Sequence, residues 1–95
     1  MTPLDEYESI VVAIIKEQEA VIGPIAIDQA RLVPGLNIDW DKKEAVLSQD
    51  PKQTIDRLVE QYKSLFGMIS VEVCKEAVGR LAQHLSADQM PLSLR

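Results

Sequence analysis

The chain has little of the material from which catalytic and metal sites are usually built. Its 95 residues include one histidine, His84, and one cysteine, Cys74. A single thiol excludes an intrachain disulfide, and a zinc site or a serine–histidine–acid triad would depend on His84 alone. His84 lies near the end of an expected helix, where a positive charge is favourable, so we interpret it as structural. Cys74 falls on an apolar helical stripe, which indicates a small buried hydrophobe rather than a nucleophile.

Aromatic residues and glycines are also scarce. With only four aromatic side chains, the core must be aliphatic, which favours packing between helices. The four glycines form no G-x-G-x-x-G pattern and none precedes a Lys-Ser/Thr pair, so no nucleotide-binding loop is predicted. The longest apolar-rich run, 9–15, is too short to span a bilayer. No basic region precedes an apolar run at the N-terminus, so no secretory signal is predicted and a cytoplasmic location is expected.

One dense group of carboxylates, in the segment 39–44, has the start of a calcium-loop pattern. Asp39 and Asp41 fit that pattern, but Lys43 stands at the third ligand position. The twelfth position holds Asp50 where a glutamate is required, so we predict a solvated turn. No metal and no cofactor are expected. Trp40, the only tryptophan, either anchors this segment onto the helices or marks a contact surface, and we favour the anchor.

Negative charge is concentrated in the first third of the sequence. The net charge is −5, and residues 1–30 hold six acids and one base, which gives 1 − 6 = −5. The remainder holds nine acids and nine bases, so it is neutral. An acidic surface repels phosphate, so neither nucleic acid nor an anionic membrane is an expected partner. The simplest alternative is that this charge only solvates an exposed face.

The pattern of apolar residues predicts a mainly α protein. Helices are expected over residues 3–22, 24–33, 51–66 and 70–85. The alternating segment 36–40 predicts a short strand, and 45–47 is either a second strand or one helical turn. We therefore expect a compact bundle of about four helices with a short extended or β segment near residues 36–47. Residues 1–85 would form a single helical domain and residues 86–95 a loosely held tail.

The first helix is apolar around nearly its whole circumference. The run from Ile10 to Ile15 contains more apolar side chains than one stripe requires. One interpretation is a second face that meets another subunit or a partner. That interface would include the residues Ile10, Val12, Ile15, Glu19, Ile22 and Pro24. The alternatives are a central helix enclosed by the other helices of the same chain, or a buried strand.

The helix corner after the first helix carries a family resemblance. Ile22-Gly23-Pro24-Ile25-Ala26, with Ala30 following, resembles a short helical module that accompanies bacterial serine/threonine kinases, adenylate cyclases and response-regulator-type signalling proteins. The resemblance implies a bacterial association or signal-relay module. It brings no catalytic residues with it.

These observations favour a small, soluble, non-enzymatic protein that acts in protein–protein interaction, as a homodimer or as a subunit of a larger complex. Its contact surface would be the apolar helix face with acidic residues at the rim. The alternative is a regulatory module that binds a small molecule between helices. A DNA-binding regulator is disfavoured, because the second helix offers only Arg31 against Asp28.

Overall fold

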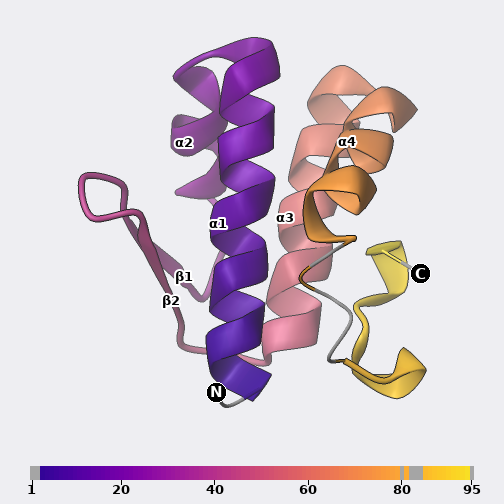
Figure 1. Ribbon diagram of the computed structural model, residues 1–95. Helices are drawn as coiled ribbons and strands as arrows, with labels where there is room; N and C mark the ends of the chain where they lie inside the picture. Colours follow the sequence, from indigo (N-terminus) through magenta and orange to yellow (C-terminus); the bar gives the residue numbers. More distant parts are fainter. Residues whose placement is uncertain (1–2, 80, 82–84, 95) are drawn as a thin grey trace.

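A computed structural model describes residues 3–79, 81 and 85–94 and shows a mainly α protein with one small antiparallel sheet (Figure 1). This confirms the expected fold class. The elements in chain order are α1 (Pro3–Ile22), α2 (Ile25–Ala30), β1 (Leu36–Asp39), β2 (Glu44–Leu47), α3 (Pro51–Phe66), α4 (Met68–Val78) and two short 3-10 helices, η2 (Ala87–Gln89) and η3 (Leu92–Leu94). The described part has a radius of gyration of 11.8 Å.

Local signals set both ends of α3. The Asp50 side chain accepts hydrogen bonds from the backbone N–H groups of Lys52 (3.0 Å) and Gln53 (3.3 Å), and Pro51 opens the helix. These contacts satisfy two donors that the first helical turn leaves free. At the other end, Gly67 adopts a φ of 81° and its N–H bonds to the carbonyl of Lys63. The predicted bounds of this helix are confirmed.

Two glycine corners lie at the same end of the bundle (Figure 1). Gly23 ends α1 with a φ of 80° and donates its N–H to the Glu19 carbonyl, as Gly67 does at the end of α3. Pro24 then stands at the N-cap of α2 in the right-handed helical region. Both glycines need left-handed backbone, which an L side chain rarely adopts. The chain therefore reverses twice at this end, from α1 to α2 and from α3 to α4.

Helix α1 is the centre of the core. The hairpin lies on one side of it and α4 on the other, with α2 and α3 also in contact (Figure 1). Ile10 and Ile15 are both 0% exposed. The prediction that these two residues belong to an open face is wrong, because the chain's own elements cover α1 from several directions. The central-helix alternative accounts for the apolar run.

Several predicted boundaries and burials are corrected by the structure. Helix α2 ends at Ala30, and α4 runs from Met68 to Val78, so it starts and stops earlier than expected. Ser70 does not cap α4; its hydroxyl donates to the Gly67 carbonyl from within the first turn. The spacing of apolar residues over 51–66 predicts that Leu65 lies on the buried stripe of α3, but its side chain is exposed. His84 lies outside the described residues.

The C-terminal segment is packed against the bundle, although it was expected to be loosely held. The hydroxyl of Tyr7 donates to the Gln89 carbonyl at 2.6 Å. The backbone N–H and the hydroxyl of Ser93 both donate to the Asp56 carboxylate, at 3.0 and 2.5 Å. Leu94 is buried in the same cluster as α1 and α3. Long-range polar partners on α1 and α3 therefore fix this segment, and nothing in its own sequence reveals them.

Candidate functional site

The six residues of the predicted interface do not form one surface. Ile10 and Ile15 are enclosed in the core, and Val12 is half-buried beside the hairpin. Only the other three members remain near the α1–α2 corner, where Ile22 is half-buried and Pro24 is exposed. The expected interface is therefore reduced to the C-terminal end of α1 and the corner that follows.

Glu19, the acidic member of that interface, is held by the hairpin. Its carboxylate accepts a hydrogen bond of 3.3 Å from the indole N–H of Trp40. The Trp40 ring is half-buried against the core, and the Lys43 ammonium lies 4.3 Å from its centroid, within cation–π range. Lys43 also donates to the Trp40 carbonyl at 2.8 Å and adopts a φ of 54°. Trp40 thus anchors the turn of the hairpin to α1, as favoured from the sequence.

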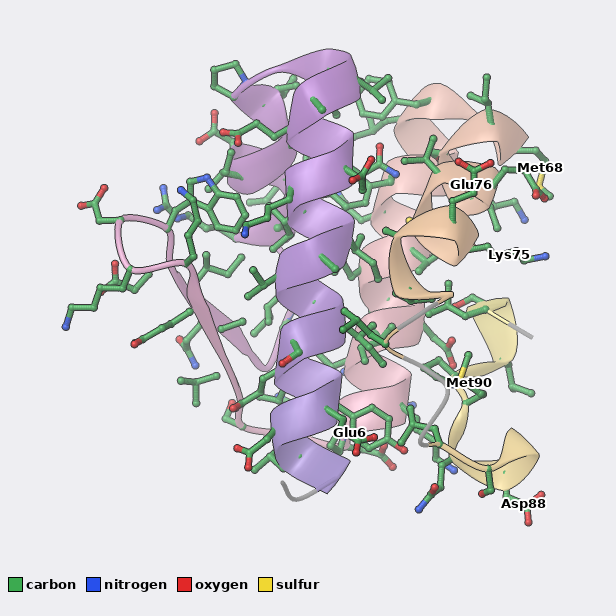
Figure 2. The ribbon with its side chains drawn as sticks, viewed as in Figure 1. Glu6, Met68, Lys75, Glu76, Asp88 and Met90 are labelled. Carbon is green, nitrogen blue, oxygen red and sulfur yellow. The ribbon has the colours of Figure 1, made fainter. Side chains whose placement is uncertain are left out.

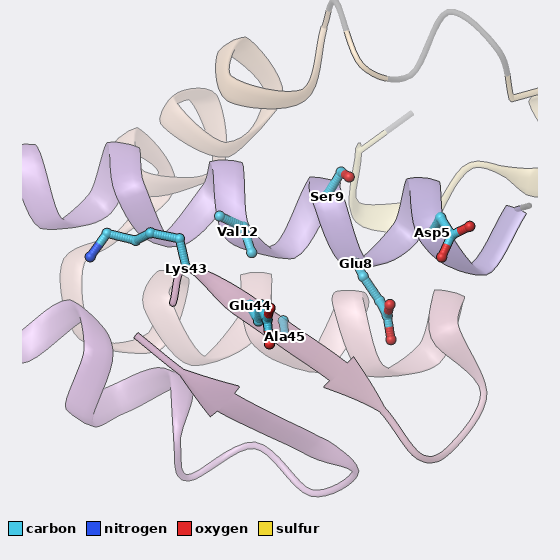
Figure 3. Close-up of a pocket in the computed structure, with 7 residues that line it drawn as sticks. All are labelled: Asp5, Glu8, Ser9, Val12, Lys43, Glu44 and Ala45. Carbon is cyan, nitrogen blue, oxygen red and sulfur yellow. The ribbon is translucent and has the colours of Figure 1, made fainter. Parts of the chain in front are cut away.

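A shallow hollow of about 330 Å³ lies between α1 and β2 (Figure 3). Its lining residues are Asp5, Glu8, Ser9, Val12, Lys43, Glu44 and Ala45. The Glu8 carboxylate accepts the backbone N–H of Leu47 at 3.3 Å, which ties β2 to α1. Small-molecule sites are usually enclosed and mostly apolar, whereas two of these seven lining side chains are apolar. Among the described residues, no group of three or more His, Cys, Asp and Glu side chains is placed to hold a metal ion.

The buried polar groups form a structural network between α1 and α4. The Gln18 amide donates to the Ser70 carbonyl at 3.0 Å and to the Cys74 sulfur at 3.3 Å. Burial raises the pKa of the Cys74 thiol, although the hydrogen bond from Gln18 opposes this shift. The thiol is therefore protonated at neutral pH, and it is inaccessible because Cys74 is fully buried.

Tyr62 completes the polar part of the core. Its hydroxyl donates to the Ala26 carbonyl at 2.6 Å, which joins α3 to α2. Burial raises the pKa of Tyr62 far above its ordinary value, and the neighbouring Cys74 raises it further. A phenol in this position holds a helix in place and stays protonated near neutral pH. The chemistry of the network is thus that of a scaffold.

Exposed apolar side chains gather at the end of the bundle where the two glycine corners lie. Five large hydrophobic residues in or beside these corners are 43 to 73% exposed: Val21, Ile25, Leu65, Met68 and Ile69. Figure 2 shows Met68 pointing away from the bundle at the start of α4. The Gln18–Ser70 hydrogen bond joins the last turns of α1 to the first turn of α4 just below these residues. We call this surface the corner surface, and define it by those five residues together with Ile22 and Pro24.

The half of the corner surface at the α3–α4 corner is not among the residues predicted from the sequence. In the sequence, Leu65 fits the apolar stripe of α3, and Met68 and Ile69 fall between the two expected helices 51–66 and 70–85. The available signal was Gly67, which marks the end of α3 and places apolar residues on both sides of a corner. Gly23 has the same relation to Val21 and Ile25.

Comparisons with known proteins give no relative from which a role could be transferred. No protein-family model, no curated protein and no solved structure matches the chain. The resemblance of the Ile22–Ala26 segment to a signalling-associated module therefore stays a prediction. Within the described residues, no helix has the length and apolar character needed to cross a membrane.

Proposed function

We propose that this protein is a non-enzymatic interaction module that binds a protein partner through the corner surface. The observation that carries the proposal is the distribution of exposed apolar residues. Ten large hydrophobic residues of the described chain are exposed, and five of them belong to the two corners at one end of the bundle. Apolar side chains gathered in this way are typical of a protein contact, whereas single ones are ordinary.

The charges near the corners indicate what kind of partner would fit. Within about five residues of a glycine corner lie three acids, Glu19, Asp28 and Glu72, and one base, Lys63, so acids are in excess there. Glu72 has an exposed partner in Lys75 at 4.0 Å, a contact that contributes little in solvent. We infer a partner that presents an apolar surface flanked by lysine or arginine. Such rim charges would mainly set the association rate and the choice of partner.

The buried groups support a role without catalysis. Cys74 and Tyr62, two candidates for nucleophilic or proton-transfer chemistry, are enclosed and hydrogen-bonded within the core. The hollow between α1 and β2 is open, and one of its charged side chains, Glu8, already binds the hairpin. The likeness of Ile22–Ala26 to a signalling-associated module favours a bacterial, cytoplasmic assembly as the setting.

The test compares matched charge substitutions at two exposed apolar positions. The wild-type protein and two variants would be cross-linked in native lysate, and bound proteins quantified by mass spectrometry. Ile69→Glu lies in the corner surface, whereas Leu92→Glu lies in η3, which packs on α3 and α4. We expect Leu92→Glu to retain the captured partner and Ile69→Glu to lose it. The proposal is contradicted if both variants retain the partner equally. It is also contradicted if the wild type captures no protein above background.

A second readout checks the inferred chemistry of the partner. The captured interaction should weaken as salt rises, because rim charges at a solvent-exposed interface are screened. Asp28→Lys should weaken it further, whereas Asp88→Lys, in the C-terminal segment, should leave it unchanged. If binding is independent of salt and of Asp28, the inferred basic rim of the partner is wrong.

A further inference from the structure

The two edges of the β-hairpin are treated differently by the rest of the chain. Residues opposite each other in an antiparallel pair alternate between hydrogen-bonded and non-bonded pairs. Ser48 donates its backbone N–H to the Gly35 carbonyl at 2.9 Å, and the register continues with Leu36 opposite Leu47. Backbone groups of Leu36 and Ile38 on β1 therefore point away from β2. Those of Ala45 and Leu47 on β2 point away from β1.

The outer edge of β2 is covered, and that of β1 is not. Figure 3 shows β2 lying between α1 and β1. The Glu8 carboxylate accepts the N–H of Leu47, so α1 satisfies an outward donor of β2. On β1, the N–H of Leu36 bonds to the Val33 carbonyl at 3.3 Å. The described sheet ends at β1, so Ile38 has no strand on its outer side.

We propose that the outer edge of β1 pairs antiparallel with β1 of a second copy of this chain, with Ile38 at the two-fold axis. In this register, Ile38 of each copy exchanges N–H and carbonyl hydrogen bonds with its counterpart. The N–H of Trp40 then meets the Leu36 carbonyl of the second copy. The Leu36–Val33 bond is kept, whereas a register centred on Asn37 would have to break it.

Side-chain hydrogen bonding favours the same register. With Ile38 at the axis, Asn37 of one copy stands directly opposite Asp39 of the other, twice. Both side chains are exposed on the outer face of the hairpin, where an amide can donate to a carboxylate. A register centred on Asp39 would instead place two like charges together. The edge therefore complements itself in side-chain hydrogen bonding as well as in backbone pairing, which favours a second copy over an unrelated extended peptide.

This inference goes beyond the proposed function, because it uses a different surface and a different partner. The strands are four residues long, so the contact is small and the association weak. Joining two hairpins would create a sheet of four strands, which is more stable than an isolated two-stranded piece. The corner surfaces lie on other elements, α1, α2, α3 and α4, and remain available in each copy.

Substitutions at Asn37 test the register by sedimentation velocity over a wide range of protein concentration. Asn37→Lys would face Asp39 of the second copy and should tighten self-association by about fivefold through two ion pairs. Asn37→Asp should weaken it by about fivefold through two like-charge pairs. The double variant Asn37→Asp/Asp39→Asn restores the complementarity and should return close to wild type. Val46→Thr, on the same face but on the covered strand, is the matched control and should change nothing.

Backbone pairing is tested separately at Ile38. Proline is tolerated on an edge strand whose N–H points outward, so Ile38→Pro should abolish self-association while circular dichroism shows the fold retained. If that variant fails to fold, the Asn37 series still decides the question. A wild type that stays monomeric at all concentrations overturns the inference. Self-association that the Asn37 variants do not change, and that Ile69→Glu removes, also overturns it and assigns the contact to the corner surface.

Discussion

Both the middle and the C-terminal end of α1 carry large apolar side chains, and the two groups differ sharply in exposure in the folded chain. Ile10 and Ile15 are 0% exposed, whereas Val21, two turns further on, is 65% exposed. The middle is enclosed by the hairpin on one side and α4 on the other. The end leads into the Gly23 corner, where the large side chain of Val21 is exposed. Whether an apolar residue is available to a partner is thus decided by the elements packed against it and not by its own helix.

The same charge placed at Ile15 and at Val21 should have the largest and most unequal effects on stability. Ile15→Glu buries a carboxylate without a partner and should remove more than ~4 kcal/mol of stability, enough to unfold a small domain. Val21→Glu, on the same helix, should stay within ~0.5 kcal/mol of wild type. Urea unfolding followed by circular dichroism measures both. A folded, monomeric Ile15→Glu protein would show that Ile15 faces a partner.

A smaller effect is expected from the polar network that joins α1 to α4. Gln18→Ala removes the amide donor to the Ser70 carbonyl and the Cys74 sulfur and leaves a small cavity. We expect a loss of about 1–3 kcal/mol in the free energy of unfolding. The matched control is Gln29→Ala, where the side-chain partner Gln61 is half-buried and can turn to solvent. Equal losses in the two variants would argue against a structural role for the buried network.

Because the Cys74 thiol is buried, we expect the free energy of unfolding to fall at alkaline pH. Because burial raises the pKa of Cys74 in the folded state, the folded protein holds this proton more tightly than the unfolded chain does. The contribution is present in full below the ordinary pKa of 9.0 and is lost as pH rises towards the folded-state pKa. The slope is at most about 1.4 kcal/mol per pH unit.

Cys74→Ala provides the control for that pH dependence. Urea unfolding of the two proteins between neutral pH and pH 10, on the order of one unit above the pKa of a thiol, isolates the contribution of Cys74. The variant should show a flatter profile over this interval. Tyr62 contributes in the same direction but at higher pH, because its ordinary pKa is 10.0 and is also raised. Parallel profiles for wild type and variant would mean that the thiol is not buried as described.

Pro24→Ala, at the corner after α1, should have the smallest effect on stability. Pro24→Ala keeps a residue that can adopt the same right-handed conformation, so the loss of stability should be below about 1 kcal/mol. Helical content by far-ultraviolet circular dichroism should not change. Partner capture should fall, because Pro24 forms part of the corner surface and sets the direction of α2. Full retention of capture would remove Pro24 from the contact.

Elements with strong local signals were predictable from the sequence. The bounds of α3 follow from Asp50, Pro51 and Gly67, each of which acts on its nearest backbone neighbours. The start of α4 was misplaced because Ser70 is a good capping residue, whereas in the structure the helix begins directly after Gly67. Gly67 and Ser70 are both plausible starting points for α4, and the packing of the folded chain determines which of them begins the helix. The long-range contacts of the C-terminal segment with Tyr7 and Asp56 leave no local trace at all.

The candidate surfaces were predictable only in part. The Gly23-Pro24 pair marks the end of α1 in the sequence, so Ile22 and Pro24, in the first half of the corner surface, could be predicted. The other half depends on how α3 and α4 meet at Gly67, which is a property of the folded chain. Which edge of the hairpin stays open is also a property of the folded chain, because Glu8 of α1 binds the outer edge of β2 and leaves that of β1 uncovered. Strand propensity alone does not distinguish the two edges.

The chain itself, and no second subunit, buries the middle of α1. Amide hydrogen exchange at high and low protein concentration tests it most directly. We expect the amides of residues 10–15 to be among the slowest to exchange, with a protection that dilution does not change. The Ile38 amide, at the proposed dimer edge, should lose protection on dilution. Loss of protection in residues 10–15 on dilution would contradict the account, since it would place a partner against α1.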